Sequence, residues 1–495
     1  MKSFLTILVL VAYATTGQAN NIDVTNVTLG ERNVVNGTRI IQFDVGWENS
    51  WRVSAAPANW DAAWIFIKFQ EQDGTWSHAT LSAATPGTSF TTTETTADSV
   101  GLFVYRTAEG SGNVAHNAIQ AVWEYRSDGV DDSALVTVEV YAVEMVYVPQ
   151  GSFYLGSDGS SLLEFYHHQS LLPLERDPYP VTSEGSIRIG ALNGDLNFVG
   201  ATYAGDLFGT LPVSFPKGYR AFYCMKYETS QQQYVKFFNT AGDAQKSLLD
   251  LAGLGTLCAD LELFRNSFCW TGANEVTTSN PYIPVTFLSA GQMMAYLDWT
   301  GLRPMTELEY EKACRGPGYP IPDEYAWGNA EINLDHYQVT NQDAGNEGVV
   351  NADEISETKG NGLYLGNALR ISLVPLQGPI RVGAFAGSGT RYTRLSSGGS
   401  YYGIMELSGN LGELVVTVGD PVGRLFSGAH GDGTLSSSGL PTVLDWPLSG
   451  TGYGSRGGSF ALPRASLRVS SREFAVTNFT AGEVHGFRGV RTAPL

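Results

Sequence analysis

The chain has 495 residues, too many for one ordinary hydrophobic core, so we expect at least two domains. A hydrophobic content of 43% and an aromatic content of 12% exclude an intrinsically disordered protein. The formal net charge of -19 disfavours nucleic acid and anionic membrane surfaces as partners, since both repel an acidic surface.

Residues 1–19 have the order of a secretory signal peptide. Lys2 precedes an apolar run from Phe4 to Ala12, and the small residues Gly17 and Ala19 follow. This order is typical of a cleaved signal, and the run is too short for a membrane anchor. No cysteine directly follows the cleavage site, so a bacterial lipid anchor is not indicated. No later stretch is long and apolar enough to cross a bilayer. We therefore expect a secreted, periplasmic or cell-surface protein.

Residues 20–143 contain short runs in which apolar and polar residues alternate, separated by turn residues. The clearest runs are Arg39–Trp47, Ala62–Phe69, Val100–Arg106 and Leu135–Val143. This period of two predicts half-buried strands, and such strands without helical patterns predict an antiparallel, immunoglobulin-like β-sandwich. Four tryptophans fall in this region: Trp47, Trp51, Trp60 and Trp64. Packing in the core is favoured for them over a platform on which sugars stack.

The remainder, residues 144–495, begins with a strand, a turn and a second strand over Met145–Ser157. A glycine- and serine-rich stretch with strand-like pieces such as Ser186–Gly190 follows. Three capping boxes then predict helix starts, because a hydroxyl and a side chain three residues later satisfy each other's backbone amides. The pairs are Ser230 with Gln233, Ser289 with Gln292, and Thr306 with Glu309. After residue 316 we expect mostly loops with short strands.

Four cysteines in an exported chain are compatible with two disulfides, and four cysteines allow three pairings. The preferred pairing is Cys258 with Cys269 and Cys224 with Cys314. Their spacing does not match a zinc site.

Seven segments, in order, carry a resemblance to a known family. They are Met145–Ser157, Phe222–Asn239, Pro284–Gly316, Tyr325–Asn329, Gly403–Leu414, Arg456–Phe460 and Gly486–Arg491. Together they resemble the formylglycine-generating enzyme (sulfatase-modifying factor) family. The resemblance covers residues 144–495, with insertions near 158–212 and 330–378. It implies an α+β fold with a C-type-lectin-like core that is poor in regular secondary structure and often stabilised by calcium.

The family oxidises a cysteine of a client sulfatase to formylglycine, with copper held by two thiolates. Those cysteines lie three and eight positions after the serine of the GGS motif. Here that serine is Ser459, and the two positions hold Leu462 and Leu467. Leucine provides no soft ligand for copper, and no cysteine follows Cys314. We therefore expect no formylglycine-generating activity and no bound copper.

The resemblance also implies a structural calcium site. Its ligands correspond to the side chains of Glu406 and Glu413 and to the carbonyls of Gly409 and Leu411. Calcium favours such mixed oxygen donors. The alternative is that Asn410 adopts a left-handed turn while both glutamates are merely solvated. A second calcium site is expected around Asn341, Asp343 and Asn346.

Iron is not expected either. A related branch of the superfamily binds iron through a separate histidine-bearing bundle, which needs ligands one helical turn apart. The seven histidines of this chain contain no H-x-x-x-H pattern.

Three functions remain open. The first is a non-catalytic binding or assembly protein at the cell surface, with an unknown protein or glycan as its partner and self-assembly as a variant. The second is a ligand-binding protein diversified by a retroelement, with Phe460–Val484 as the variable segment. The third is an oxidase with an unrecognised metal site.

A ligand is expected beside Leu462 and Leu467. Candidate contacts near this position are Tyr401, Tyr402, Phe460, Arg464 and Phe474. Six arginines also gather near the C-terminus: Arg456, Arg464, Arg468, Arg472, Arg488 and Arg491. A structural role is favoured for Arg488 and Arg491, while the others are left open between structure and anion binding.

Overall fold

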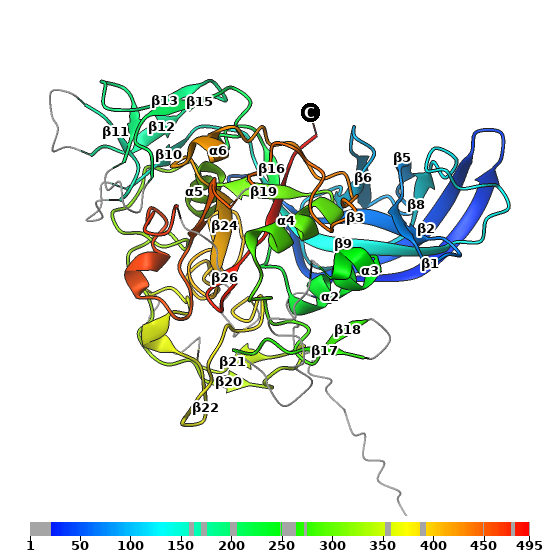
Figure 1. The fold of residues 1–495 in the computed structure, drawn as a ribbon. Coiled ribbons are helices and arrows are strands. Elements are labelled where there is room, and N and C mark those ends of the chain that lie inside the picture. Colours follow the sequence, from blue (N-terminus) through cyan, green and yellow to red (C-terminus); the bar gives the residue numbers. More distant parts are fainter. Residues whose placement is uncertain are drawn as a thin grey trace, which may run out of the picture.

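A computed structural model of the chain describes residues 21–157, 163–169, 176–198, 205–247, 249, 264–271, 275–351, 358–386, 393–448, 450–476 and 481–494. Strands predominate and helices are few (Figure 1), in agreement with the β-rich α+β class. The immunoglobulin-like and C-type-lectin-like details stay predictions. No helix in the described ranges has the length and apolar character that a membrane crossing requires. The predicted signal peptide lies outside these ranges.

The N-terminal strands form two facing sheets. One sheet has the order β1-β2-β8-β5 and comprises β1 (Asp23–Asn33), β2 (Thr38–Arg52), β8 (Gly110–Trp123) and β5 (Leu81–Thr85). The other contains β3 (Asp61–Gln70), β4 (Trp76–His78), β6 (Thr91–Thr95), β7 (Leu102–Arg106) and β9 (Thr137–Val148). Alternate residues of β2 and β3 bury a common apolar cluster between the sheets. The four predicted strand runs coincide with β2, β3, β7 and β9, so these predictions are confirmed.

The second sheet continues far beyond the N-terminal strands. Its eleven strands have the order β25-β24-β19-β27-β16-β9-β3-β7-β6, with β26 beside β24 and β4 beside β3. The additional strands are β16 (Phe222–Met225), β19 (Arg303–Thr306), β24 (Gly412–Val416), β25 (Tyr453–Arg456), β26 (His485–Gly486) and β27 (Gly489–Thr492). Strand β9 pairs with β3 on one side and with β16 on the other. The expected boundary between residues 143 and 144 therefore falls within β9, and the two parts share one sheet.

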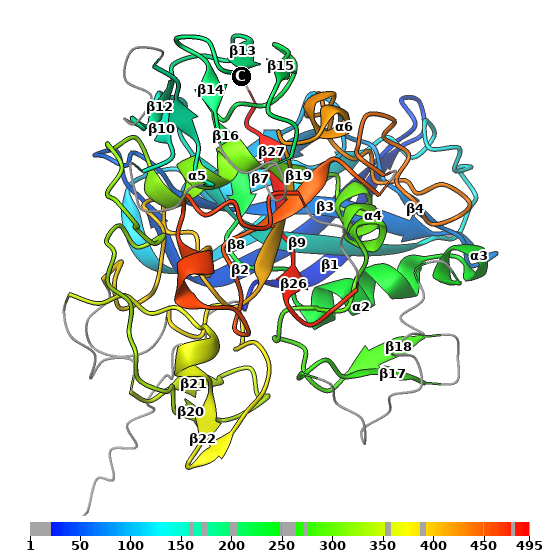
Figure 2. The same cartoon turned by 60° about the vertical axis from the view of Figure 1, so that its left-hand side comes forward.

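Helices cover the second face of this sheet (Figure 2). On this face lie α2 (Gln231–Thr240) and α4 (Ala290–Trp299). Helix α5 (Glu307–Arg315) packs Tyr310 and Cys314 against Val146 on the opposite face. The remaining helices are α3 (Asp243–Lys246) and α6 (Pro421–Arg424), with 3-10 turns η1 (Leu365–Asn367) and η2 (Arg464–Leu467). All three predicted capping boxes are present: the Gln233, Gln292 and Glu309 amides donate to Ser230, Ser289 and Thr306 over 3.4, 3.3 and 3.2 Å. Trp64 lies between the sheet and this layer, where its indole N–H donates to the Thr300 carbonyl over 2.8 Å.

The tryptophans of the N-terminal strands contribute to packing, the role that the sequence favoured for them. Trp47 and Trp64 are buried. Trp60 stacks on Tyr147 with ring centroids 3.9 Å apart, and the guanidinium of Arg52 lies 4.4 Å from its ring.

Both insertions contain short strands. In the first, β10 (Phe153–Leu155) pairs with β12 (Tyr179–Val181), and a sheet has the order β11-β14-β13-β15. Its strands are β11 (Tyr166–His167), β14 (Leu196–Asn197), β13 (Ile187–Ile189) and β15 (Gly209–Leu211). Three further hairpins are β17 (Phe268–Trp270) with β18 (Val276–Thr278), β20 (Val339–Thr340) with β21 (Gly348–Val349), and β22 (Arg370–Ile371) with β23 (Val374–Pro375). The first insertion lies at the top of Figure 2, and the hairpins lie at the bottom.

Candidate functional site

The GGS turn follows strand β25 and carries the chain toward the two leucines. Gly457 and Gly458 both have positive φ, 89° and 66°, which favours glycine. A Cβ on Gly458 would stand 2.6 Å from Cδ1 of Leu467, so the turn packs directly on that leucine. The Gly457 carbonyl accepts from the Gly409 amide over 2.9 Å, which joins this turn to the predicted calcium loop.

The two leucines lie in different surroundings. Leu467 is fully buried in an apolar cluster with Tyr325, Trp327, Ile332 and Tyr364. Leu462 is partly exposed and is not part of that cluster; its carbonyl accepts from the Leu365 amide over 3.0 Å. Leu467 therefore acts as a core residue.

The other expected ligand contacts are not gathered in one place. Tyr401 and Tyr402 meet edge-on, 5.0 Å between ring centroids, in the cluster that also holds the cysteines. Phe460 packs against a separate cluster, with the Phe264 ring 6.0 Å away. Phe474 is partly buried and Arg464 is exposed on η2. Their ligand-binding role stays a prediction.

The predicted disulfide between Cys224 and Cys314 is wrong, because both are free thiols. They lie in one apolar cluster, Cys224 on β16 and Cys314 on α5, fully buried. Burial raises the pKa of both thiols, that of Cys314 to about 12, so neither has thiolate character. Cys269 is disulfide-bonded, while its predicted partner Cys258 lies outside the described residues.

The predicted calcium loop has two buried glutamates, so the solvated alternative is wrong. Asn410 has the left-handed φ of 65° that this alternative also required. Oε1 of Glu406 accepts from the Gly383 amide over 2.9 Å, and Oε1 of Glu413 accepts from Nε of Arg488 over 2.7 Å. The Oε2 atoms of both carboxylates are buried without a hydrogen-bond partner among the described residues.

A third buried carboxylate lies beside this loop. Glu228 accepts from the Asn410 side-chain amide over 2.5 Å and from the Leu411 amide over 2.9 Å. Burial, and then the charges of Glu413 and Glu406, raise its pKa well above its usual range. Burial likewise raises the pKa of Glu406 to about 7.

These observations fit a hard cation. Two unpartnered buried carboxylate oxygens are the donors that calcium prefers, and the Gly409 and Leu411 carbonyls belong to the same loop. Over the described part of the chain, no three His, Cys, Asp or Glu side chains form a metal cluster. A calcium ion here would therefore depend on carbonyl oxygens and water as well as on Glu406 and Glu413.

The second expected calcium loop uses its acidic side chain differently. Asp343 Oδ1 accepts from Nη2 of Arg265 over 2.7 Å, and Arg265 also pairs with the buried Glu347. Asn341 and Asp343 both have positive φ, and the Asn341 side chain donates to the Asn346 carbonyl over 3.4 Å. Arginine therefore neutralises the charge that a calcium ion would otherwise balance.

The buried arginines near the C-terminus hold the fold together. Arg456 and Arg472 both donate to Glu307. Arg488 donates to Glu413, and Arg491 pairs with Asp98 beneath the Trp64 ring. Arg468 forms a more exposed pair with Asp323. The structural role expected for Arg488 and Arg491 thus extends to Arg456 and Arg472.

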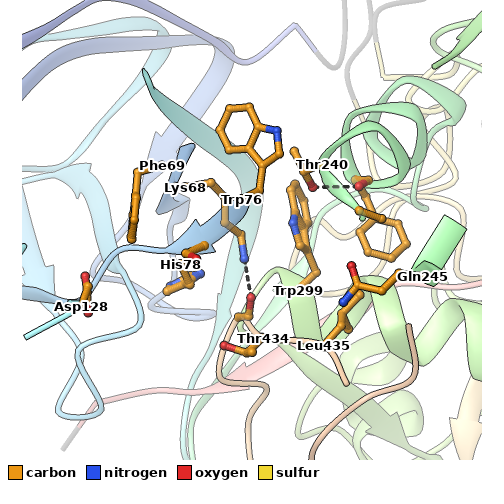
Figure 3. A pocket seen from close by; sticks show the side chains of 14 residues that line it. Lys68, Phe69, Trp76, His78, Asp128, Thr240, Gln245, Trp299, Thr434 and Leu435 are labelled. Atoms are coloured by element: carbon orange, nitrogen blue, oxygen red, sulfur yellow. Dashed lines mark hydrogen bonds between the residues drawn. The ribbon is translucent and has the colours of Figure 1, made fainter. Parts of the chain in front are cut away.

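A cleft lies at the seam between the N-terminal strands and the helices, far along the sheet from the GGS turn. Its inner cavity of about 220 Å³ is lined by Lys68, Trp76, His78, Phe237 and Trp299, among others (Figure 3). It shares the lining residues Trp76, Thr240 and Gln245 with an adjoining outer groove of about 1040 Å³. Sequence reasoning missed this site, because its walls come from segments that are distant in the chain.

No curated protein matches the chain significantly. The model of the sulfatase-modifying factor enzyme 1-like domain matches residues 200–493, more than half of the chain. The match includes the GGS turn, the predicted calcium loop and helices α2, α4 and α5. The chain therefore belongs to the formylglycine-generating enzyme (sulfatase-modifying factor) family.

Proposed function

We propose that this protein is an exported, non-catalytic member of the family that binds a partner at the cell surface. The observation that carries this proposal is the identity of the residues at the two positions that correspond to the copper-binding cysteines of the family. Leu467 occupies one of them and completes a buried apolar cluster, and Leu462 occupies the other. Neither side chain supplies a soft ligand or a redox group.

The remaining thiols do not compensate for this loss. Cys224 and Cys314 are buried in a different cluster, and their raised pKa values disfavour the thiolate form that metal binding requires. A rigid, arginine-linked frame that presents irregular loops is suited to binding. A structural calcium at Glu406 and Glu413 is part of the proposal, since it would bind the buried Oε2 atoms that lack a hydrogen-bond partner among the described residues.

The test combines metal analysis with an activity assay on the mature protein. After purification in metal-depleted buffer, mass spectrometry should find calcium but no stoichiometric copper or iron. A cysteine-containing sulfatase peptide should yield no aldehyde that a hydrazide reagent captures, whereas a family member with both cysteines converts it. Copper or iron at one per chain, together with aldehyde formation, would contradict the proposal and favour an oxidase.

A further inference from the structure

The cleft at the seam has three walls. The β3–β4 hairpin of the N-terminal strands forms one wall, helices α2 and α3 form the second, and the loop around Gly433 lines the inner cavity. The outer groove reaches from Gln70 and Asp73 on the hairpin to Gln232 and Lys246 on the helical side. Its volume of about 1040 Å³ is at the upper end of typical ligand sites, so it suits an extended ligand.

Trp76 lies where the cavity and the groove meet. It is the first residue of β4, where it pairs with Gln70 of β3 at the edge of the sheet, and its side chain is only partly buried. The side chains of Trp76, Lys68 and Trp299 surround the same space (Figure 3). A partly exposed indole offers a flat apolar surface together with a polar N–H group. A sugar ring can stack its C–H face on such a surface and accept a hydrogen bond from the N–H group.

Lys68 provides a polar group within the inner cavity. Its Nζ donates to the Gly433 carbonyl over 2.6 Å and lies 5.0 Å from the Trp299 ring. Burial lowers the pKa of Lys68 well below its usual range, with Asp298 and Asp432 opposing this effect. Among the described residues the Gly433 carbonyl is the hydrogen-bond acceptor of this amine, and an amine with one acceptor retains capacity to bond a ligand hydroxyl or carbonyl.

The charge of the groove selects against anionic ligands. Four acidic residues line it, against two lysines: Asp73, Glu139, Asp243 and Glu275, with Lys236 and Lys246. Amides and hydroxyls lie between them: Gln70, Thr75, Gln232, Asn239, Thr240, Gln245 and Ser437. Such a wall suits an uncharged chain rich in hydroxyl groups. A site for a peptide would need apolar pockets at alternate positions or a continuous strand edge. The strand at this edge, β4, is only three residues long, so a peptide is disfavoured.

We propose that the cleft binds a neutral oligosaccharide, with one sugar ring stacked on Trp76 and a terminal unit in the inner cavity beside Lys68. The inner cavity, at about 220 Å³, is smaller than a typical whole-ligand site and fits one end of a chain. This inference rests on the proposed function, because it names the ligand class of a non-catalytic binding protein. It adds a site outside the GGS turn.

The test uses the full mature chain and hexasaccharides of cellulose, xylan, mannan and chitin, with dextran sulfate as the anionic comparison. Titration calorimetry should show binding of at least one neutral hexasaccharide, more tightly than of dextran sulfate. Trp76→Ala should weaken that binding at least about tenfold, as expected for a central aromatic contact. Phe90→Ala is the matched control, since Phe90 is an exposed aromatic residue in the turn before β6, 47% accessible and outside the cleft.

A second variant tests the site independently in case Trp76→Ala does not fold. Lys68→Met keeps the length of the side chain and removes the amine, and it should weaken binding severalfold at an unchanged near-UV spectrum. Binding of no neutral hexasaccharide, equal binding by wild type and both variants, or preference for dextran sulfate or a peptide would overturn the inference. Aldehyde formation by the same preparation would instead overturn the proposed function. An inactive preparation that binds no sugar therefore refutes only the oligosaccharide site.

Discussion

Arg472 binds Glu307 through two parallel hydrogen bonds, Nε to Oε2 over 2.8 Å and Nη2 to Oε1 over 3.1 Å, with both side chains fully buried. The guanidinium lies between the rings of Phe165 and Phe198, 4.0 and 4.1 Å from their centroids. Glu307 begins helix α5, and both phenylalanines belong to the first insertion. This pair therefore connects the C-terminal segment, the central helix and the insertion.

Replacing Arg472 with methionine should destabilise the protein by about 3–5 kcal/mol, because Glu307 loses one of its two buried guanidinium partners. The measurement is urea-induced unfolding. The control is Arg468→Met, which removes a half-exposed pair with Asp323 and should cost no more than about 1 kcal/mol. Equal losses from both variants would contradict a special role for the buried pair.

Leu467→Ala should cost about 2–5 kcal/mol, since it leaves a cavity among buried aromatic residues. The partly exposed Leu462 is the internal comparison, and Leu462→Ala should cost clearly less. Urea-unfolding curves of Leu467→Ala and Leu462→Ala measure the two losses of stability. A larger loss at Leu462 would show that Leu467 does not have the core role described here.

Two thiols should react with Ellman's reagent when the protein is unfolded in urea without reductant, and none in the native state. The reactive pair is Cys224 and Cys314, which are free but buried, whereas Cys269 is disulfide-bonded. Burial and raised pKa values suppress the thiolate that attacks the reagent. Reaction of no thiol in urea would restore the disulfide that the sequence predicted.

His116 and His430 should each contribute a loss of stability as the pH drops from about 6.5 toward 4. Burial lowers the folded-state pKa of each to about 4, from an ordinary value of 6.5. In this interval the unfolded chain binds more protons, so each histidine lowers the unfolding free energy by about 1.4 kcal/mol per pH unit.

Asp298, Glu406 and Glu228 act in the opposite sense, because burial raises their pKa values, to about 6 for Asp298 and about 7 for Glu406, and protonation there favours the folded state. The measured quantity is therefore the difference between wild type and His116→Gln or His430→Gln. Each variant should show a flatter loss of stability between pH 6.5 and 4. Parallel pH profiles for wild type and both variants would contradict the assignment.

Chelation of calcium should lower the melting temperature of the wild type, and added calcium should restore it. The physical reason is that a cation would bind the buried Oε2 atoms of Glu406 and Glu413, which lack a hydrogen-bond partner among the described residues. Glu406→Gln removes one charge and should make the melting temperature insensitive to chelator. Asp343→Asn is the control at the second loop, where Arg265 already pairs with the aspartate. A wild type that does not respond to chelator would remove calcium from the proposal.

Local chemistry in the sequence determined the strands and the helix starts. Alternation in Arg39–Trp47 identifies β2, because side chains of a strand point to opposite faces whatever surrounds them. The three capping boxes act within four residues, and a leucine at position 467 excludes a thiolate in any fold. These inferences need only neighbours in the chain.

Only the tertiary structure decided which distant groups meet. It brought β9 between β3 and β16, left Cys224 and Cys314 as free thiols, and buried the glutamates of the predicted calcium loop. It also placed Lys68, Trp76 and Trp299 around one cavity, although more than two hundred residues separate the first from the last. Burial and contact across such separations depend on the packing of the whole chain, and no local pattern records them.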